Sequence, residues 1–191
     1  MRARFSWSKA LPWVVTVALL SGAWVIAEFT LPESASERPF VQSTQVGDRA
    51  VGRNIAVTVL DVQAARTITT DDGWSASGSW VVIELEAAAV VQQTAAALNG
   101  ATLQIDGVTY SASERVTSAN SLYRTSLVPG VARHGVIAFE IAPDMLTGTG
   151  LLQLSLSTDT RLESVIELEI DLGSLPVHDE VALIPTDWAK P

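Results

Sequence analysis

Cysteine is absent from this chain of 191 residues. Its absence excludes disulfide bonds, thiolate catalysis, zinc sites with cysteine ligands and lipid attachment through a cysteine. The length accommodates one ordinary domain of about 100–150 residues together with a membrane segment. The core of that domain must therefore provide its stability without covalent crosslinks.

Histidine is scarce, and only His134 and His178 occur. Neither lies in a hydrolase or zinc-protease motif, because the sequence contains no G-x-S-x-G and no H-E-x-x-H pattern. We expect both histidines to be exposed to solvent. We also expect no catalytic residue, no cofactor and no metal site.

Positive charge is scarce beyond the start of the chain. Arg2, Arg4 and Lys9 precede an apolar run, whereas all 21 acidic residues lie at or after Glu28. Nine basic residues against these 21 leave a formal charge of −12 on residues 28–191. So acidic a surface repels phosphate groups, which excludes nucleic acid as a partner and disfavours anionic lipid headgroups.

Residues 10–27 (ALPWVVTVALLSGAWVIA) carry no charge. A helix of this length spans about 27 Å, close to the thickness of the hydrocarbon core of a membrane. The basic residues before it and Glu28 and Glu33 after it favour a cytoplasmic N-terminus. The sequence predicts a cytoplasmic segment over residues 1–9 and a transmembrane signal anchor over residues 10–31, which attaches the chain to the bacterial cytoplasmic membrane with its C-terminal domain outside.

A cleaved secretory signal is the alternative, because Val25-Ile26-Ala27 resembles a signal-peptidase site. The protein would then be secreted after cleavage near Ala27. The polar residues 32–48 that follow predict a flexible linker, since they offer too little apolar surface to fold alone.

Apolar and polar residues alternate with a period of two beyond the linker. This alternation is typical of strands with one buried face. It predicts seven strands, over residues 55–59, 81–86, 103–105, 108–110, 137–141, 152–156 and 166–172. Asp106-Gly107 between two of them predicts a tight hairpin.

Seven such strands predict an all-β fold, an immunoglobulin-like antiparallel β-sandwich over residues 49–172. The Ala-rich residues 87–98 are the exception, and we expect them to cross between the sheets with one helical turn. Residues 173–191 form a C-terminal tail, which we expect to dock along a sheet edge.

Four motifs follow in order: Ser79–Glu86 with Trp-Val-Val, Leu103–Tyr110 with Asp-Gly-x-x-Tyr, Leu127–Val131 with Pro-Gly, and Gly135–Pro143 with Phe-Glu-Ile-Ala-Pro. The chain thereby resembles the immunoglobulin-like domains of unknown function found on Gram-positive, especially actinobacterial, envelope proteins. The resemblance implies an extracytoplasmic β-sandwich with no established enzymatic activity. The apolar residues 87–97 depart from the family, which often has an Asn-rich turn there.

Acidic residues in predicted turns raise the hypothesis of calcium binding, at Asp71-Asp72, at Asp106, and at Asp159 with Glu163. None has the spacing of a calcium-binding loop, so turn formation and solvation explain them better. Six residues remain as possible partner contacts, either as apolar anchors or as an acidic stripe on one sheet face. These residues are Trp74, Glu167, Glu169, Asp171, Leu183 and Trp188.

Three functions are compatible with these features. The first is a non-enzymatic interaction module of the cell envelope, which binds an envelope protein. The second is an accessory subunit of a membrane transporter or export system, with Ser21, Gly22 and Ala23 at an intramembrane helix contact. The third is a cell-wall hydrolase, which needs a nucleophile and a base in one cleft.

Overall fold

The computed structural model describes residues 7–29, 37–91 and 96–190. The chain divides into two compact units, Met1–Arg38 and Pro39–Pro191. Each unit is described by itself.

The first unit contains the helix α1 (Trp7–Phe29). Pro12 lies inside it, and the hydroxyl of Thr16 donates a hydrogen bond to the Pro12 carbonyl at 2.9 Å. Apolar side chains are exposed along α1, including Trp13 at 75% and Trp24 at 67%. The helical part of the predicted anchor is confirmed. Over the described residues, no helix has both the length and the hydropathy needed to cross a membrane.

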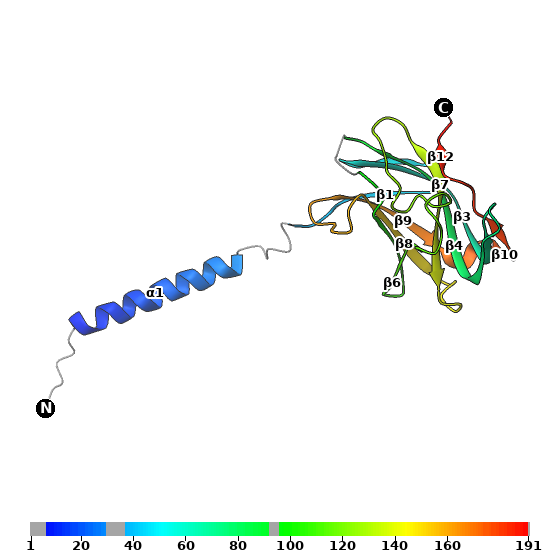
Figure 1. Ribbon diagram of the computed structural model, residues 1–191. Coiled ribbons are helices and arrows are strands. Elements are labelled where there is room, and N and C mark those ends of the chain that lie inside the picture. The colour runs from blue at the N-terminus through cyan, green and yellow to red at the C-terminus, as the bar shows by residue number, and fades with distance from the viewer. Residues whose placement is uncertain (1–6, 30–36, 92–95, 191) are drawn as a thin grey trace. The chain divides into compact units, whose positions relative to one another are not determined.

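The second unit is a sandwich of two β-sheets (Figure 1). The five-stranded sheet has the order β1 (Phe40–Thr44), β9 (Ser164–Asp171), β8 (Thr149–Ser155), β5 (Gly100–Ile105), β6 (Val108–Ser111). The seven-stranded sheet has the order β10 (Val177–His178), β3 (Ile55–Thr69), β4 (Ser75–Ala89), β7 (Arg133–Ile141), β12 (Asp187–Trp188), with β2 (Arg49–Val51) and β11 (Val181–Ala182) also paired to β3. The 3-10 turn η1 (Leu172–Ser174) follows β9.

The seven predicted strands are confirmed, because they coincide with β3 to β9. Residues 156 and 172 fall just beyond the ends of β8 and β9. The Asp-Gly hairpin is also confirmed, since Ile105 pairs with Val108 and both turn residues have positive φ, +46° at Asp106 and +80° at Gly107. This geometry belongs to the two-residue turn that suits the twist of a hairpin.

The sheets are not wholly antiparallel. β1 runs parallel to β9, with Phe40 opposite Ser164, and both β10 and β11 run parallel to β3. The linker prediction for residues 32–48 is therefore wrong for Phe40–Thr44, which form β1, while residues 32–36 fall outside the described residues. A polar strand at a sheet edge needs no apolar alternation, which is why its sequence is typical of a linker.

The Ala-rich segment also differs from the prediction. Ala87–Ala89 extend β4, and Ala97 makes a bridge with Ser126, so no helical turn occurs in the described residues 87–91 and 96–98. Ala87, Ala88 and Ala89 are all buried. A strand that is buried on both faces carries a continuous apolar run. Burial of both faces, rather than helix formation, therefore explains the run of alanines.

Two separate apolar clusters stabilise the sandwich. The main core fills the space between the sheets, with Ile83 and Phe139 from one sheet and Leu103 and Leu168 from the other. The second cluster covers part of the outer face of the seven-stranded sheet; its larger members are Trp80, Val82, Val116, Val136, Ile68 and Leu183. Trp80 is fully buried, and it lies in this second cluster rather than between the sheets.

The predicted docking of the tail along a sheet edge is confirmed, and the tail reaches both edges. β10 and β11 pair with β3, and Asp187 and Trp188 of β12 pair with His134 and Arg133 of β7. The amide of Leu183 donates to the Thr69 carbonyl at 2.8 Å. The tail therefore caps both exposed edges of this sheet, which protects them from pairing with other chains.

Candidate functional site

The predicted acidic stripe lies on the outer face of the five-stranded sheet. In β9, Glu167, Glu169 and Asp171 alternate with the buried Ile166, Leu168 and Ile170. Side chains two residues apart point to the same face of a strand, so the carboxylates form one row with a spacing of about 6.6 Å.

Hydrogen bonds hold the half-buried end of this row. Gln153 Nε2 of β8 donates to Glu167 Oε1 at 2.8 Å, and Thr102 Oγ1 of β5 lies 3.5 Å from Gln153 Oε1. These contacts fix the Glu167 carboxylate across three neighbouring strands. Within the described residues, the carboxylates of Glu169 and Asp171 take part in no hydrogen bond or ion pair, and both residues are exposed.

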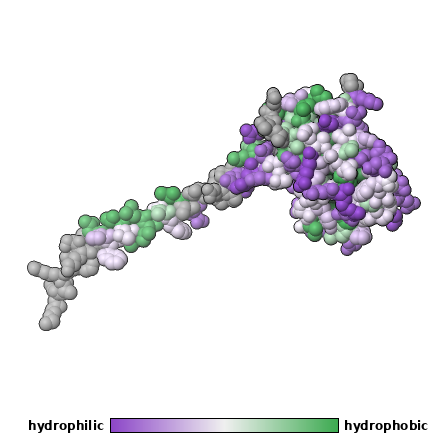
Figure 2. Space-filling view, in the orientation of Figure 1, coloured by the Kyte–Doolittle hydropathy of each residue, from purple (hydrophilic) through white to green (hydrophobic). Residues whose placement is uncertain are grey.

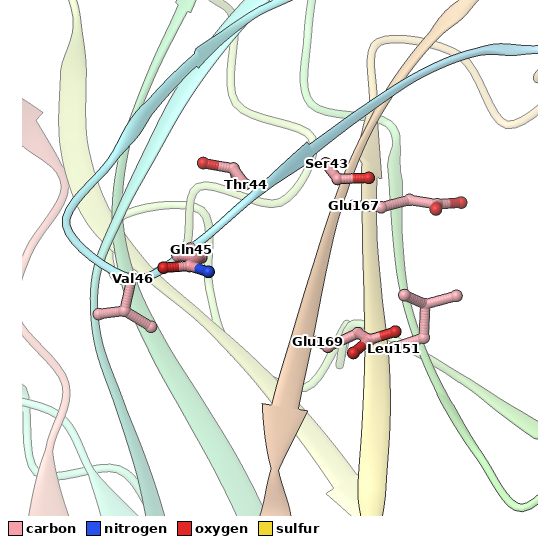
Figure 3. A pocket seen from close by; sticks show the side chains of 7 residues that line it. All are labelled: Ser43, Thr44, Gln45, Val46, Leu151, Glu167 and Glu169. Atoms are coloured by element: carbon pink, nitrogen blue, oxygen red, sulfur yellow. The ribbon is translucent and has the colours of Figure 1, made fainter.

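A groove opens beside the row where β1 leaves β9. The last pair of the two strands joins Thr44 to Leu168, so the edge of β9 at residues 169–171 has no partner from β1. Figure 3 shows Glu167, Glu169 and Leu151 on one side of the groove and the segment from Ser43 to Val46 on the other. The groove has a volume of about 520 Å³, and none of the described residues that line it is cationic.

This arrangement can bind a cationic, extended ligand. Unpaired carboxylates attract Lys or Arg side chains, and a free strand edge presents backbone donors and acceptors to an added strand. No group of three or more His, Asp or Glu side chains in the described residues could hold a metal ion.

The other predicted contact residues lie elsewhere. Trp74 is half-buried in the turn between β3 and β4, and it packs against the second cluster. Leu183 belongs to that cluster and is 3% exposed, so the prediction of Leu183 as a surface contact is wrong. Trp188 is 41% exposed at the β7 edge, with the Arg133 guanidinium 4.1 Å from its ring centroid. The six residues thus form no single site.

The two histidines differ in their exposure to solvent. His178 in β10 is exposed, as predicted. His134 is half-buried, and its Nε2 lies 2.7 Å from Glu84 Oε1 on the outer face of the seven-stranded sheet. The prediction of exposure is wrong for His134, because the pairing of β4 with β7 brings this carboxylate beside it. No feature of the local sequence identifies Glu84 as its partner.

The candidate calcium residues form turns. Asp72 accepts hydrogen bonds from the Thr70 hydroxyl and from the Trp74 amide, which lower the pKa of its carboxyl group. Asp159 binds Arg161 at 2.7 Å, and this guanidinium lowers the pKa of Asp159 to about 2. Side chains that bind their own turn in this way are typical of Asx turns.

Comparison with known proteins gives fold neighbours only. No family model and no curated protein matches the chain. One similar solved structure is a "putative lipoprotein" from Staphylococcus aureus, with 10% identity and a TM-score of 0.46, covering 72% of this chain and 97% of the other. Another is an uncharacterised β-sandwich protein from Clostridium difficile, with 12% identity and a TM-score of 0.49, covering 71% and 97%. At these values neither likeness carries an argument about function.

Proposed function

We propose that this protein is a non-enzymatic interaction module of the bacterial cell envelope, which binds a cationic protein segment on the outer face of its five-stranded sheet. The observation that supports this function is the exposed pair of carboxylates, Glu169 and Asp171, beside an unpaired stretch of the β9 edge. A carboxylate without a partner retains its full attraction for an incoming cation.

Attachment to the cytoplasmic membrane is the second part of the proposal. Its support is the uncharged run of residues 10–27, the basic residues before it and the acidic residues after it. The sandwich then lies outside the cell, with the N-terminus in the cytoplasm. Secretion after cleavage near Ala27 remains the alternative. The more specific assignment to the immunoglobulin-like envelope family belongs to the same proposal, and its support is the order of the four motifs.

Charge removal tests the binding face. The variant Glu169→Gln/Asp171→Asn removes both unpaired carboxylates with almost no change in shape. Asp61→Asn/Asp71→Asn is the matched control, because it removes two exposed carboxylates from other surfaces. Tagged full-length proteins are purified from gently solubilised cells, and the proteins that copurify are quantified by mass spectrometry.

We expect the amount of copurified partner to fall several-fold with the first variant and to stay unchanged with the control. Equal recovery with both variants and with the wild type contradicts the acidic-face proposal. Loss with both variants shows that net charge, rather than this face, governs the association, and it also contradicts the proposal.

An accessory subunit of a transporter is the second candidate. The observation that favours it is the small-residue segment of α1, since a Cβ atom added to Gly22 meets no atom within 4 Å. Small residues allow a second helix to approach closely in a membrane. Replacement of residues 10–27 by an unrelated apolar helix abolishes function if this candidate is correct and leaves it intact if the sheet face is sufficient. No observation in the described residues favours the hydrolase hypothesis over these two.

A further inference from the structure

A second pocket opens on the outer face of the five-stranded sheet. Thr102 of β5 and Gln153 of β8 lie opposite one another and alternate with Leu103 and Leu152 of the main core, so both point outward. Residues of the loops after β6 and β8 complete the pocket. Its volume is about 190 Å³, below the roughly 300–1,000 Å³ of pockets for drug-sized ligands. We call it the hydroxyl pocket, after the lining residues Thr102, Ser111, Tyr123, Ser155, Thr158 and Thr160.

The loop after β8 forms a fixed wall of the hydroxyl pocket. Its backbone approaches β5 so closely that a Cβ atom added to Gly100 would lie 2.0 Å from Ser155 Oγ and 2.7 Å from the Ser157 carbonyl oxygen. Only glycine allows this approach of loop to strand. The Ser155 hydroxyl donates to the Ser157 carbonyl at 2.6 Å, and Asn99 Nδ2 donates to the Leu156 carbonyl at 3.0 Å. These contacts hold the wall in place before any ligand binds.

Hydroxyl and amide groups supply the polar atoms of the hydroxyl pocket. Nine of its twelve lining residues carry such a group, and none of the described lining residues is charged. In the part of the chain that the structure describes, the hydroxyls of Ser111, Tyr123, Thr158 and Thr160 take part in no hydrogen bond. A free hydroxyl can both donate and accept. Figure 2 shows that hydrophilic and near-neutral side chains cover most of the visible face of the domain.

The ring of Tyr123 adds a firmly held aromatic side chain. Tyr123 is half-buried and packs against the main core. The Arg124 guanidinium lies 5.2 Å from the centroid of this ring and binds Glu114 Oε1 at 2.8 Å. Tyrosine offers apolar ring surface together with a polar tip. The methyl groups of Ala101 and Val165 add further apolar surface to the pocket.

These properties favour an uncharged ligand that combines hydroxyl groups with apolar C–H surface. A charged ligand would lose hydration and find no opposite charge in the pocket. A wholly apolar ligand would cover the free hydroxyls and leave them without partners. A saccharide ring has hydroxyls around its rim and C–H groups on its faces. We infer that the hydroxyl pocket binds one ring of a neutral saccharide, either a free sugar or a unit of an envelope glycan.

The hydroxyl pocket and the acidic groove are separate sites on one sheet face. Gln153 lines the pocket, and its Nε2 donates at 2.8 Å to Glu167, which lines the groove. Saccharide binding requires neither the carboxylates of Glu169 and Asp171 nor a cationic partner. It therefore adds a second activity to the proposed function and does not depend on it.

Fluorine NMR of the full chain labelled with fluorotyrosine tests saccharide binding, because the sequence contains only two tyrosines. Tyr123 lines the pocket, and Tyr110, which does not, is the internal control. The protein is kept in a zwitterionic detergent that carries no sugar. It is titrated with glucose, with galactose, with N-acetylglucosamine, with the tetramer of N-acetylglucosamine, and with sorbitol, which has the hydroxyls of a sugar but no ring.

We expect at least one of the ring sugars to shift the Tyr123 resonance to saturation and to leave the Tyr110 resonance unchanged. Sorbitol should shift neither. The absence of a saturable shift with every ring sugar, equal shifts at both tyrosines, or an equal shift with sorbitol overturns the assignment. Several-fold tighter binding of the tetramer than of its monomer supports an envelope glycan as the source, and equal affinity supports a free sugar.

A pair of matched variants tests whether the pocket is the site. Ser111→Ala/Thr158→Val removes two exposed hydroxyls that line the pocket. Ser118→Ala/Thr109→Val removes the same groups from exposed positions outside it. We expect the affinity for the saccharide to fall several-fold with the first variant and to stay unchanged with the second. Unchanged affinity with both variants, or an equal loss with both, overturns the assignment.

The hydroxyl pocket and the proposed function can fail separately. Glu169→Gln/Asp171→Asn should leave the Tyr123 shift unchanged, because these side chains do not line the pocket. Its effect on copurified proteins tests the acidic face alone. A Tyr123 shift without any loss of partner contradicts the acidic-face proposal and supports the pocket. Loss of partner without a Tyr123 shift for any sugar overturns the pocket and leaves the acidic face standing.

Discussion

The two sheets of the sandwich use their outer faces differently. The seven-stranded sheet has much of its outer face covered, because the tail and the loop around Val116 bury Trp80 and Val82. The five-stranded sheet leaves its outer face open and polar, with Glu169 and Asp171 exposed. The sequence already differs in the same sense: Val81-Val82-Ile83 is a continuous apolar run, whereas residues 166–171 alternate strictly. A covered face serves stability, and an open face is available for contact.

We expect the largest loss of stability from removal of Trp80, the central side chain of the covered face. Trp80→Ala removes a fully buried indole from the second cluster and should reduce the free energy of unfolding by about 3–5 kcal/mol. The matched change on the open face, Thr102→Ala, should cost less than about 1.5 kcal/mol, because it loses one long hydrogen bond. Urea denaturation followed by circular dichroism measures both. Similar losses with the two variants would contradict the larger contribution of the covered face to stability.

The next effect concerns the tail that covers this face. Leu183→Ala should lower the free energy of unfolding by about 2–5 kcal/mol, because the side chain is buried. The amide of residue 183, which donates to the Thr69 carbonyl, should exchange its hydrogen faster. Val177→Ala in the same tail is the control, since Val177 is 53% exposed and its loss should change stability by less than about 0.5 kcal/mol. Unchanged exchange at residue 183 would contradict docking through Leu183.

On the open face, charge removal should leave stability nearly unchanged. Glu169→Gln/Asp171→Asn breaks no hydrogen bond or ion pair described for these side chains, so the free energy of unfolding should change by less than about 0.5 kcal/mol. Equilibrium denaturation in urea measures the change. A loss as large as that of Leu183→Ala would assign these carboxylates to folding rather than to contact.

The smallest expected effect is a change in how the stability of the fold depends on pH. Arg161 lowers the pKa of Asp159 to about 2 in the folded chain, below its ordinary value of 3.8. Because the pKa of Asp159 is lower in the folded than in the unfolded chain, its charged form stabilises the fold at pH values above the unfolded-state pKa. This contribution is lost as the pH falls from about 4 to about 2. Arg161→Gln should flatten this part of the stability curve slightly, as measured by thermal unfolding at several pH values. An unchanged curve would show that this exposed pair contributes nothing.

The strict alternation of residues 166–171 and the Asp106-Gly107 turn allowed the strands and the hairpin to be predicted. β1 could not be predicted, because Phe40–Thr44 pair with residues more than a hundred positions away and carry few apolar residues. The contact of His134 with Glu84 depends in the same way on pairing between distant strands.

The acidic row of the candidate site was predictable as a pattern on one strand face. The groove beside it was not, since it exists only because β1 ends opposite Leu168.

Photocrosslinking in intact cells tests most directly whether the open face is the contact face. A photoreactive residue replaces Glu169 on the open face, and a second variant carries it at Asp61, an exposed carboxylate on the outer face of the other sheet. The account predicts a reproducible protein adduct at residue 169 and none, or much less, at residue 61. Adducts at residue 61 alone, or at neither position in a folded and exported protein, would contradict it.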